Sequence, residues 1–268
     1  MGQNDVRLYG QLAVKPRFRR HRGETEAYRC ELYVKTMSRY NNSTEKGNIV
    51  YDEVCVMTES PEMIRNIGER LLLTENDMIY VKGVVCTTNV ERKVICGECE
   101  EEFALPGSTC YVHPINIMKV EANVPKDTGY VRIRENVEVS NEVLVHGNVC
   151  TDINYSEEFH HSNYKLAVKR QYHILEDPAD KRIDYPIINT YYQMADDDHE
   201  YLHKGSGMIV RGSLRARSIE RKVICPNCGN PETIGYKLLE IVGHGTSYTN
   251  DWNKTGTNKD EDTDSTDE

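Results

Sequence analysis

The sequence contains little phenylalanine and tryptophan, with 3 Phe and 1 Trp among 268 residues, whereas tyrosine is abundant at 17. Hydrophobic residues make up 38% of the chain, and no apolar run reaches the roughly 18 residues that a membrane-spanning helix needs. These shortages favour small domains with polar, solvent-exposed surfaces and exclude a helical membrane span. Tyrosine suits binding faces, because one end of its ring is apolar and the other is polar.

Targeting signals and common enzyme motifs are also missing. The N-terminus has no basic segment followed by an apolar one, so we expect a cytoplasmic protein. In that reducing compartment, the 9 Cys residues should be thiols or metal ligands. The motifs G-x-x-x-x-G-K and G-x-S-x-G do not occur. We therefore expect a protein that is not an enzyme, and we interpret the acidic run 196–198 as the solvated start of a short helix.

Negative charge is concentrated at the C-terminal end. The net charge is -10, and residues 251–268 hold seven acids and two lysines, which leaves -5 for the tail and -5 for the rest. Local basic clusters therefore remain possible in the body of the chain. Residues 246–268 are rich in Thr, Asn, Asp and Gly and are expected to be disordered. Such a tail either keeps the protein soluble, binds a partner protein, or competes for the protein's own cationic groove.

Three ordered blocks of the sequence occur twice. Residues 91–99 match residues 220–228, residues 78–83 match residues 207–212, and residues 8–12 match residues 145–149. The offset is 129 residues for the first two blocks and 137 for the third, as expected when loops between conserved elements differ in length. The chain is therefore a duplication of one domain.

Each copy reads as five strands with a helix between the third and the fourth. In copy one, strands are expected at 6–14, 28–36, 51–58, 77–89 and 115–120, with a helix at 61–73. In copy two they are expected at 143–149, 164–172, 185–191, 208–219 and 236–242, with a helix at 199–203. This order fits the OB-fold, a small Greek-key barrel. Bends or bulges that close such barrels are expected at Gly10, Gly83, Gly147 and Gly212.

The second copy resembles the single-stranded DNA-binding proteins of bacteria and phages. Residues 201–205 read Tyr-Leu-His-Lys-Gly, and residues 209–218 read Ile-Val-Arg-Gly-Ser-Leu-Arg-Ala-Arg-Ser, like the family segment that ends in a basic fourth strand. The resemblance implies binding of single-stranded DNA and, with two folds per chain, a homodimer. It also implies replication or recombination proteins as partners of the acidic tail. The tail nevertheless lacks the apolar-aromatic tip of the family, and cysteine insertions are atypical for it.

The cysteine pattern of copy one predicts a zinc ribbon at about 94–114. Two pairs at C-x2-C and C-x2-H spacing supply four ligands, Cys96, Cys99, Cys110 and His113, which suit a closed structural Zn²⁺ site. The alternative is two free thiols on a hairpin, with Cys110 buried in a strand and His113 on the surface.

Copy two keeps only one of the two ligand pairs. Cys225 and Cys228 are interpreted as the remnant of a decayed ribbon, or as a second site completed by a histidine from elsewhere or by another chain. Cys30, Cys55, Cys86 and Cys150 fall in predicted strands and are expected in the core.

An OB barrel binds single strands on the face of its second and third strands and on the adjoining loops. Cations follow the phosphates there and flat rings stack on bases. The loop at 15–22 carries five cations around one aromatic residue. The nucleic-acid-binding candidates of copy one are Arg17, Phe18, Arg19, Arg20, Arg22, Tyr28, Tyr33, Lys35, Arg92 and Lys93. Those of copy two are Tyr155, Phe159, Tyr164, Lys169, Arg170, Arg211, Arg215, Arg217, Arg221 and Lys222. Tyr40, Tyr172, Tyr191 and Tyr192 are further stacking candidates, whereas Trp252 is expected either to cap the barrel or to begin a mobile tail.

Together these patterns predict an all-β protein with short helices, built as two tandem OB-fold barrels with a zinc ribbon between strands four and five of the first. The expected domains are residues 1–124, a linker at 125–142, a second barrel at 143–245 and the tail at 246–268. The favoured function is sequence-tolerant binding of single-stranded DNA in replication, recombination or repair. The alternatives are a protein-interaction adaptor in a replication or conjugation assembly, and a binder of single-stranded RNA.

Overall fold

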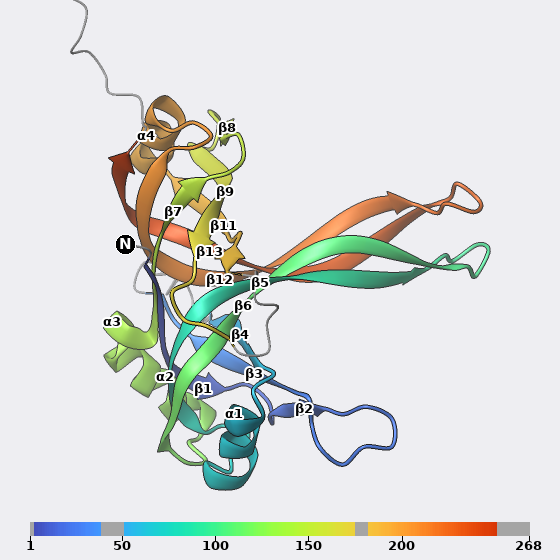
Figure 1. The fold of residues 1–268 in the computed structure, drawn as a ribbon, viewed down its shortest axis with the longest axis vertical. Helices are drawn as coiled ribbons and strands as arrows, with labels where there is room; N and C mark the ends of the chain where they lie inside the picture. Colours follow the sequence, from blue (N-terminus) through green and yellow to red (C-terminus); the bar gives the residue numbers. More distant parts are fainter. Residues whose placement is uncertain (1–2, 39–50, 175–181, 251–268) are drawn as a thin grey trace, which may run out of the picture.

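The computed structural model describes residues 3–38, 51–174 and 182–250 and shows an all-β protein with short helices (Figure 1). The predicted fold class is therefore confirmed. None of the helices in these ranges is long and apolar enough to span a bilayer. The candidate Tyr40 lies outside the described residues, as does the acidic segment 251–268 with Trp252.

The first barrel consists of five strands: β1 (Asn4–Leu12), β3 (Arg29–Thr36), β4 (Asp52–Thr58), β5 (Met78–Ile95) and β6 (Glu102–Glu121). β1 pairs with β3, β3 with β4, and β4 with β6 in parallel, while β5 pairs with both β6 and β1. This closed order is that of an OB-fold. Residues alternate between inside and outside along β3, where Cys30, Leu32 and Val34 are buried.

The second barrel repeats the same order with β7 (Asn141–Val149), β9 (His161–Lys169), β11 (Ile187–Tyr191), β12 (Gly207–Ile224) and β13 (Pro231–Asn250). β7 pairs with β9, β9 with β11, β11 with β13 in parallel, and β12 with both β13 and β7. Three short strands extend this framework: β2 (Arg17–Arg19) and β8 (Asn154–Ser156) lie in the first loop of each barrel, and β10 (Ile183–Asp184) pairs with β9. The duplication read from the sequence is therefore visible in the topology.

A helical segment lies between the third and fourth strands of each barrel, as predicted. In the first barrel it begins with α1 (Pro61–Arg65), where the Ser60 side chain accepts a hydrogen bond from the Met63 N–H and Pro61 occupies the first turn. It continues as a π-helical turn, η2 (Asn66–Arg70). In the second barrel α4 (Gln193–Tyr201) begins six residues before the predicted start at His199.

Equivalent glycines allow close strand contacts in the two barrels. A Cβ atom at Gly83 would collide with the His113 carbonyl oxygen, and one at Gly212 with that of Val242. Beside each of these glycines the strand register shifts, so that one extra residue enters the partner strand: Ile115 in β6 and His244 in β13. The predicted bulges at these two positions are confirmed.

The two barrels are joined through their first strands. β1 and β7 pair antiparallel from Asn4 opposite Val145 to Leu8 opposite Asn141, which makes one continuous sheet of both barrels. The predicted linker at 125–142 is mostly helical, with α2 (Lys126–Glu135) and α3 (Val137–Ser140) packed on the first barrel. The Ser140 hydroxyl, for example, donates to the Tyr9 carbonyl oxygen at 2.7 Å.

The fourth and fifth strands of each barrel extend past it as a long hairpin (Figure 1). The β5–β6 hairpin (78–121) and the β12–β13 hairpin (207–250) run side by side to their tips; we call their projecting parts, residues 88–109 and 217–238, the arm. The predicted domain limits change in consequence, because residues 246–250 belong to β13 and not to a disordered tail.

Candidate metal centre and nucleic-acid interface

Each hairpin of the arm ends in a turn with two cysteines, and the two turns have the same backbone. The N–H of Glu100 donates to the Cys96 carbonyl oxygen at 3.0 Å, and the N–H of Gly229 donates to that of Cys225 at 3.0 Å. Both donors have positive φ, 56° at Glu100 and 74° at Gly229. Each turn therefore presents two sulfurs toward the same side, as C-x2-C metal-binding turns do.

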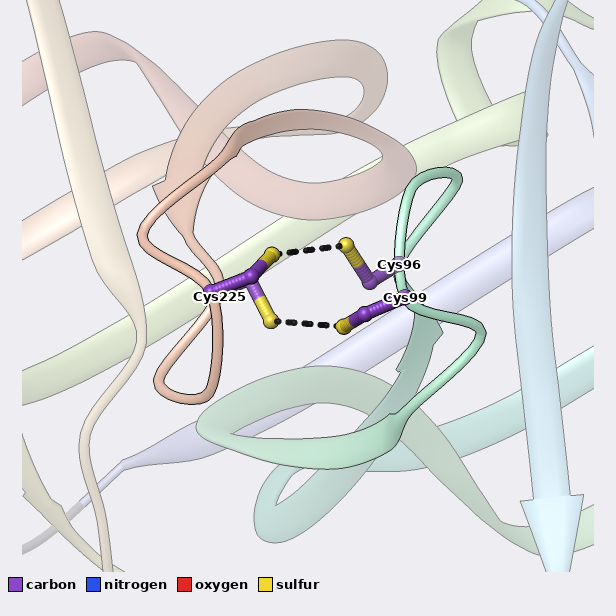
Figure 2. A group of neighbouring side chains, drawn as sticks. Cys96, Cys99 and Cys225 are labelled. Atoms are coloured by element: carbon purple, nitrogen blue, oxygen red, sulfur yellow. Dashed lines mark hydrogen bonds between the residues drawn. The ribbon is translucent and has the colours of Figure 1, made fainter.

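The two turns face each other across the arm, and their four sulfurs meet (Figure 2). All four Sγ atoms lie within 4.8 Å of one another. Cys96 Sγ is 3.5 Å from Cys228 Sγ, and Cys99 Sγ is 3.7 Å from Cys225 Sγ. Sulfurs bound to one zinc at about 2.3 Å in a tetrahedron would be about 3.8 Å apart, so the cluster has the dimensions of a four-thiolate site.

Polar groups surround the cluster and join the hairpins. The backbone N–H of Glu101 hydrogen-bonds the Cys99 sulfur and is the main cause that lowers the pKa of this thiol to about 7. The N–H of Gly97, in the first turn, donates to Glu232 Oε1 of the second hairpin at 2.8 Å. Further down the arm, the Arg92 guanidinium lies 4.1 Å from the centre of the Tyr236 ring.

The predicted ligand set Cys96, Cys99, Cys110 and His113 is wrong in its second half. In the β5–β6 ladder Ile95 faces Glu102, but Cys110 faces Thr87 and His113 faces Val84. The nine residues from Thr87 to Cys96 correspond to about 30 Å of strand, so Cys110 and His113 cannot reach the sulfurs of Cys96 and Cys99. Both are buried in the body of the first barrel instead, where Cys110 belongs to the core.

Cys225 and Cys228 are likewise not a decayed remnant. They complete the cluster of Cys96 and Cys99 within the same chain, so the site needs neither a histidine nor another chain. The sequence spacing within one hairpin could not show this partnership between copies, although the two identical C-x2-C spacings were its signal. Of the other cysteines, Cys30 and Cys86 are buried, while Cys55 and Cys150 are partly exposed.

Cations and rings of the first barrel gather beside β3. Arg17 and Arg19 lie exposed on β2, which pairs with β3. The Arg17 guanidinium is 4.9 Å from the centre of the Tyr33 ring, and Arg19 forms an ion pair with Glu31 at 3.3 Å. Phe18 points the other way and is partly buried against the core.

The remaining candidates of the first barrel divide between this face and the arm. Tyr28 is 40% exposed and stacks on His21 with ring centres 4.3 Å apart, so it offers a flat surface next to the cationic loop. Arg20 and Arg22 are exposed in that loop, and Lys35 lies on β3. Arg92 and Lys93 belong to the arm, where Lys93 is paired with Glu102 at 2.6 Å.

In the second barrel the aromatic candidates have different surroundings. Phe159 is 68% exposed, at the loop before β9. Tyr155 stacks on His199 with ring centres 4.2 Å apart and donates its hydroxyl hydrogen to Asp196. Tyr164, in contrast, is 1% exposed and fills the barrel interior. Its assignment as a base-stacking residue is therefore wrong.

Lys169 and Arg170, which are neighbours at the end of β9, point in opposite directions. Lys169 is exposed, whereas Arg170 is 3% exposed and forms an ion pair with Asp184 at 2.5 Å. The same carboxylate accepts from the Thr87 N–H at 2.7 Å and so connects the second barrel to the base of the first hairpin. Arg170 is therefore a buried structural residue, and its predicted contact with nucleic acid is wrong.

The basic residues of β12 are exposed along the whole strand. Arg211 pairs with Glu142 at 2.6 Å near the junction of the barrels, and Arg217 with Glu240 at 3.2 Å where the arm begins. Arg215 lies between them, and Arg221 and Lys222 follow on the arm. These cations thus form a line from the junction toward the tip of the second hairpin.

The acidic run 196–198 within α4 contains a buried residue that sequence reasoning missed. Asp198 is fully buried, and its carboxylate accepts from the hydroxyls of Tyr164, Thr190 and Tyr248 at 2.7–2.9 Å. Burial raises the pKa of this carboxyl group to about 6. Nothing in the run distinguishes it from its solvated neighbours except its place on the inner face of the helix.

Comparisons with known proteins agree with this description. Residues 140–224 match the profile of the Single-strand binding protein family, which confirms the resemblance seen in the second copy. The wild-type single-stranded DNA binding protein from Thermus aquaticus has a similar fold, with a TM-score of 0.56 and 18% identity over 95% of this chain and 97% of that chain. A deletion mutant of that protein gives a TM-score of 0.54 and 18% identity over 96% and 98%.

These matches describe the fold of the whole chain and the sequence pattern of its second barrel. The second barrel carries the sequence pattern of the single-strand binding family, and the chain over nearly its whole length has the fold of a bacterial single-stranded DNA-binding protein. No curated protein sequence matches the chain.

Proposed function

We propose that this chain is a sequence-tolerant single-stranded DNA-binding protein that acts in DNA replication, recombination or repair. The observation that carries the proposal is the pair of closed OB barrels on one continuous sheet, with exposed cations and rings beside the second strand of the first barrel. The match of residues 140–224 to the single-strand binding family supports the same conclusion.

The chemistry of these surfaces suits a flexible strand and not a duplex. Arg17, Arg20 and Arg22 can follow phosphates, and Tyr28 and Tyr33 offer ring faces on which any base can stack. Stacking contributes about 1–3 kcal/mol per base and does not depend on the base, so binding through these rings should tolerate any sequence. Since each chain already holds two barrels, we propose that it works as a homodimer in the cytoplasm, where its thiols stay reduced.

The test is a fluorescence titration of the full-length chain into labelled oligo-dT at low salt. We expect tight binding, with unlabelled oligo-dT competing well and duplex DNA of the same length competing poorly. Better competition by oligo-U than by oligo-dT would show that the protein prefers single-stranded RNA. Absence of binding to either strand would reject it and leave the role of a protein-interaction adaptor.

We further propose that the four-cysteine cluster binds zinc and that this zinc is structural. Four thiolates in a closed set leave no open position for catalysis and suit zinc by ligand type and geometry. The arm has little apolar interior of its own, since Val94 and Val223 are its only buried aliphatic side chains among the described residues 88–109 and 217–238. Metal binding would supply the stability that packing does not, because its free energy becomes folding free energy.

Metal analysis of the purified chain tests this second proposal. One zinc per chain is expected, because both C-x2-C turns contribute to a single site. Two zincs per chain would show that each hairpin has its own site, and none would contradict the proposal.

A further inference from the structure

A cavity of about 520 Å³ lies at the seam between the two barrels. The first barrel contributes Ser38 and Asp52, and the second contributes residues of β11, α4, β12 and β13. The volume is in the range of ligand-binding pockets, about 300–1,000 Å³. The pocket is separate from the cationic loop and from the metal cluster, so the features described so far do not account for it.

The bulge in β13 builds one wall of this pocket. The extra residue is His244, whose side chain lines the cavity. Its Nε2 atom is 2.8 Å from the Ser213 hydroxyl of the same barrel and 3.3 Å from the Ser38 hydroxyl of the other barrel. Bulges commonly redirect a side chain next to a functional site. Here the redirected ring holds the two barrels together at the pocket wall.

Two tyrosines at the end of β11 line the same cavity. Tyr191 stacks on His161 with ring centres 4.8 Å apart, which fixes its orientation. Tyr192 is 78% exposed and has φ 57° and ψ -140°, a conformation that residues with a side chain rarely adopt. Its N–H donates to the His160 carbonyl oxygen at 2.7 Å and holds it there. Strained residues of this kind cluster at ligand sites.

Two charged side chains, Arg215 and Asp52, line the pocket together with the tyrosines. Arg215 lines it and is exposed, and it belongs to the line of cations on β12. Asp52 lines the side of the first barrel, where a carboxylate suits an N–H of a base edge and not a phosphate. An exposed ring, a cation and nearby polar groups at a seam together fit one nucleotide: a base against the ring and a phosphate at the cation.

We propose that this inter-barrel pocket binds one nucleotide of the bound strand, with its base stacked on Tyr192 and its phosphate held by Arg215. The proposal rests on the proposed function and adds a specific contact to it. It places the strand across the seam of the barrels, between the face of the second barrel and the line of cations on β12.

Replacing Tyr192 with glycine tests the stacking role without harming the fold. Glycine adopts positive φ freely, so Tyr192→Gly should leave the thermal midpoint unchanged or higher while it removes the ring. We expect the affinity for oligo-dT to fall about tenfold or more, the loss that one stacked base brings. Tyr192→Phe, which keeps the ring, should bind as the wild type does.

Leu72→Gly is the matched control, because Leu72 also has positive φ, at 46°, and is 61% exposed far from the pocket, at the end of the first barrel's helical segment. It should bind oligo-dT as the wild type does. Wild-type affinity in Tyr192→Gly, or an equal loss in Leu72→Gly, would overturn the proposal.

Photocrosslinking gives an independent readout. An oligo-dT with 5-iodouracil at successive positions should crosslink to the peptide that contains Tyr191 and Tyr192. If the wild type binds the oligonucleotide but crosslinks only elsewhere, the pocket proposal fails and the proposed function stands. If the wild type does not bind oligo-dT, the proposed function itself fails.

Discussion

Asp198 is a carboxyl group inside the second barrel that holds three hydroxyl groups in place. Tyr164, Thr190 and Tyr248 reach it from β9, β11 and β13, so it joins three strands to α4. Burial disfavours its charged form, and its pKa rises from 3.8 to about 6. The folded protein therefore keeps this proton up to a higher pH than the unfolded chain does, and the contribution of Asp198 to stability falls as pH rises from about 4 to about 6.

The variant Asp198→Asn removes this titration. Relative to the variant, the wild type should gain up to about 3 kcal/mol in free energy of unfolding when pH is lowered from 7 to 4, because two pKa units correspond to about that energy. Urea unfolding of both proteins at several pH values measures the difference in free energy of unfolding. The contributions of the other carboxyl groups are the same in both proteins and cancel in this difference. A difference that does not vary with pH would show that Asp198 has an ordinary pKa.

Arg170 shows how burial changes the role of a basic residue. Its ion pair with Asp184 is inside the protein, with side-chain exposures of 2% and 0%. Arg170→Ala leaves that carboxylate without its partner and should lower the free energy of unfolding by about 3–5 kcal/mol. Lys169→Ala, at the exposed neighbouring position, should change it by less than about 0.5 kcal/mol. Equal effects of the two substitutions in urea unfolding would contradict the structural role.

At the scale of elements, the hairpins show what the sequence could and could not predict. The repeat of residues 91–99 at 220–228 indicated that the two hairpins are related, and alternation predicted strands at 77–89 and 208–219 but not their continuation to Ile95 and Ile224. The ligand set was assigned within one copy because Cys110 and His113 follow at a plausible spacing. Strand register decides between this ligand set and the four-cysteine cluster. β6 continues without interruption through Cys110 and His113, which keeps both residues away from the turn. The contact between the two hairpins of the arm is a tertiary feature with no signal in the spacing of either copy.

The four-cysteine cluster joins the two hairpins, and a metal bound there would make them depend on each other. Cys225→Ser removes one ligand from the second hairpin, and we expect backbone amides at 91–105 in the first hairpin to exchange hydrogen about tenfold faster or more. Hydrogen exchange followed by mass spectrometry measures this. Cys150→Ser is the control, because that thiol lies in the second barrel outside the cluster. Unchanged exchange in the first hairpin of Cys225→Ser would show that the cluster does not join the hairpins.

At the scale of the whole molecule, duplication and strand pairing explain the architecture. Two copies of five strands predicted two barrels, and both barrels close in the predicted order. The way they join could not be predicted, because pairing of β1 with β7 depends on two edges that are far apart in sequence. The packed helices at 126–140 and the pocket at the seam both follow from this junction. Whether a predicted binding residue can reach nucleic acid depends on the direction of its side chain, as the burial of Tyr164 and Arg170 shows.

The most direct test of the account is the salt dependence of oligo-dT binding in the wild type and in the double variant Arg17→Ala, Arg22→Ala. Each cation that neutralises a phosphate adds about 0.7 to the slope of log affinity against log salt concentration for a single strand. We predict a steep slope for the wild type, a slope reduced by about 1.4 in the double variant, and an unchanged slope in Arg132→Ala on α2. Binding that is absent at low salt, or a slope that the double variant leaves unchanged, would contradict the account.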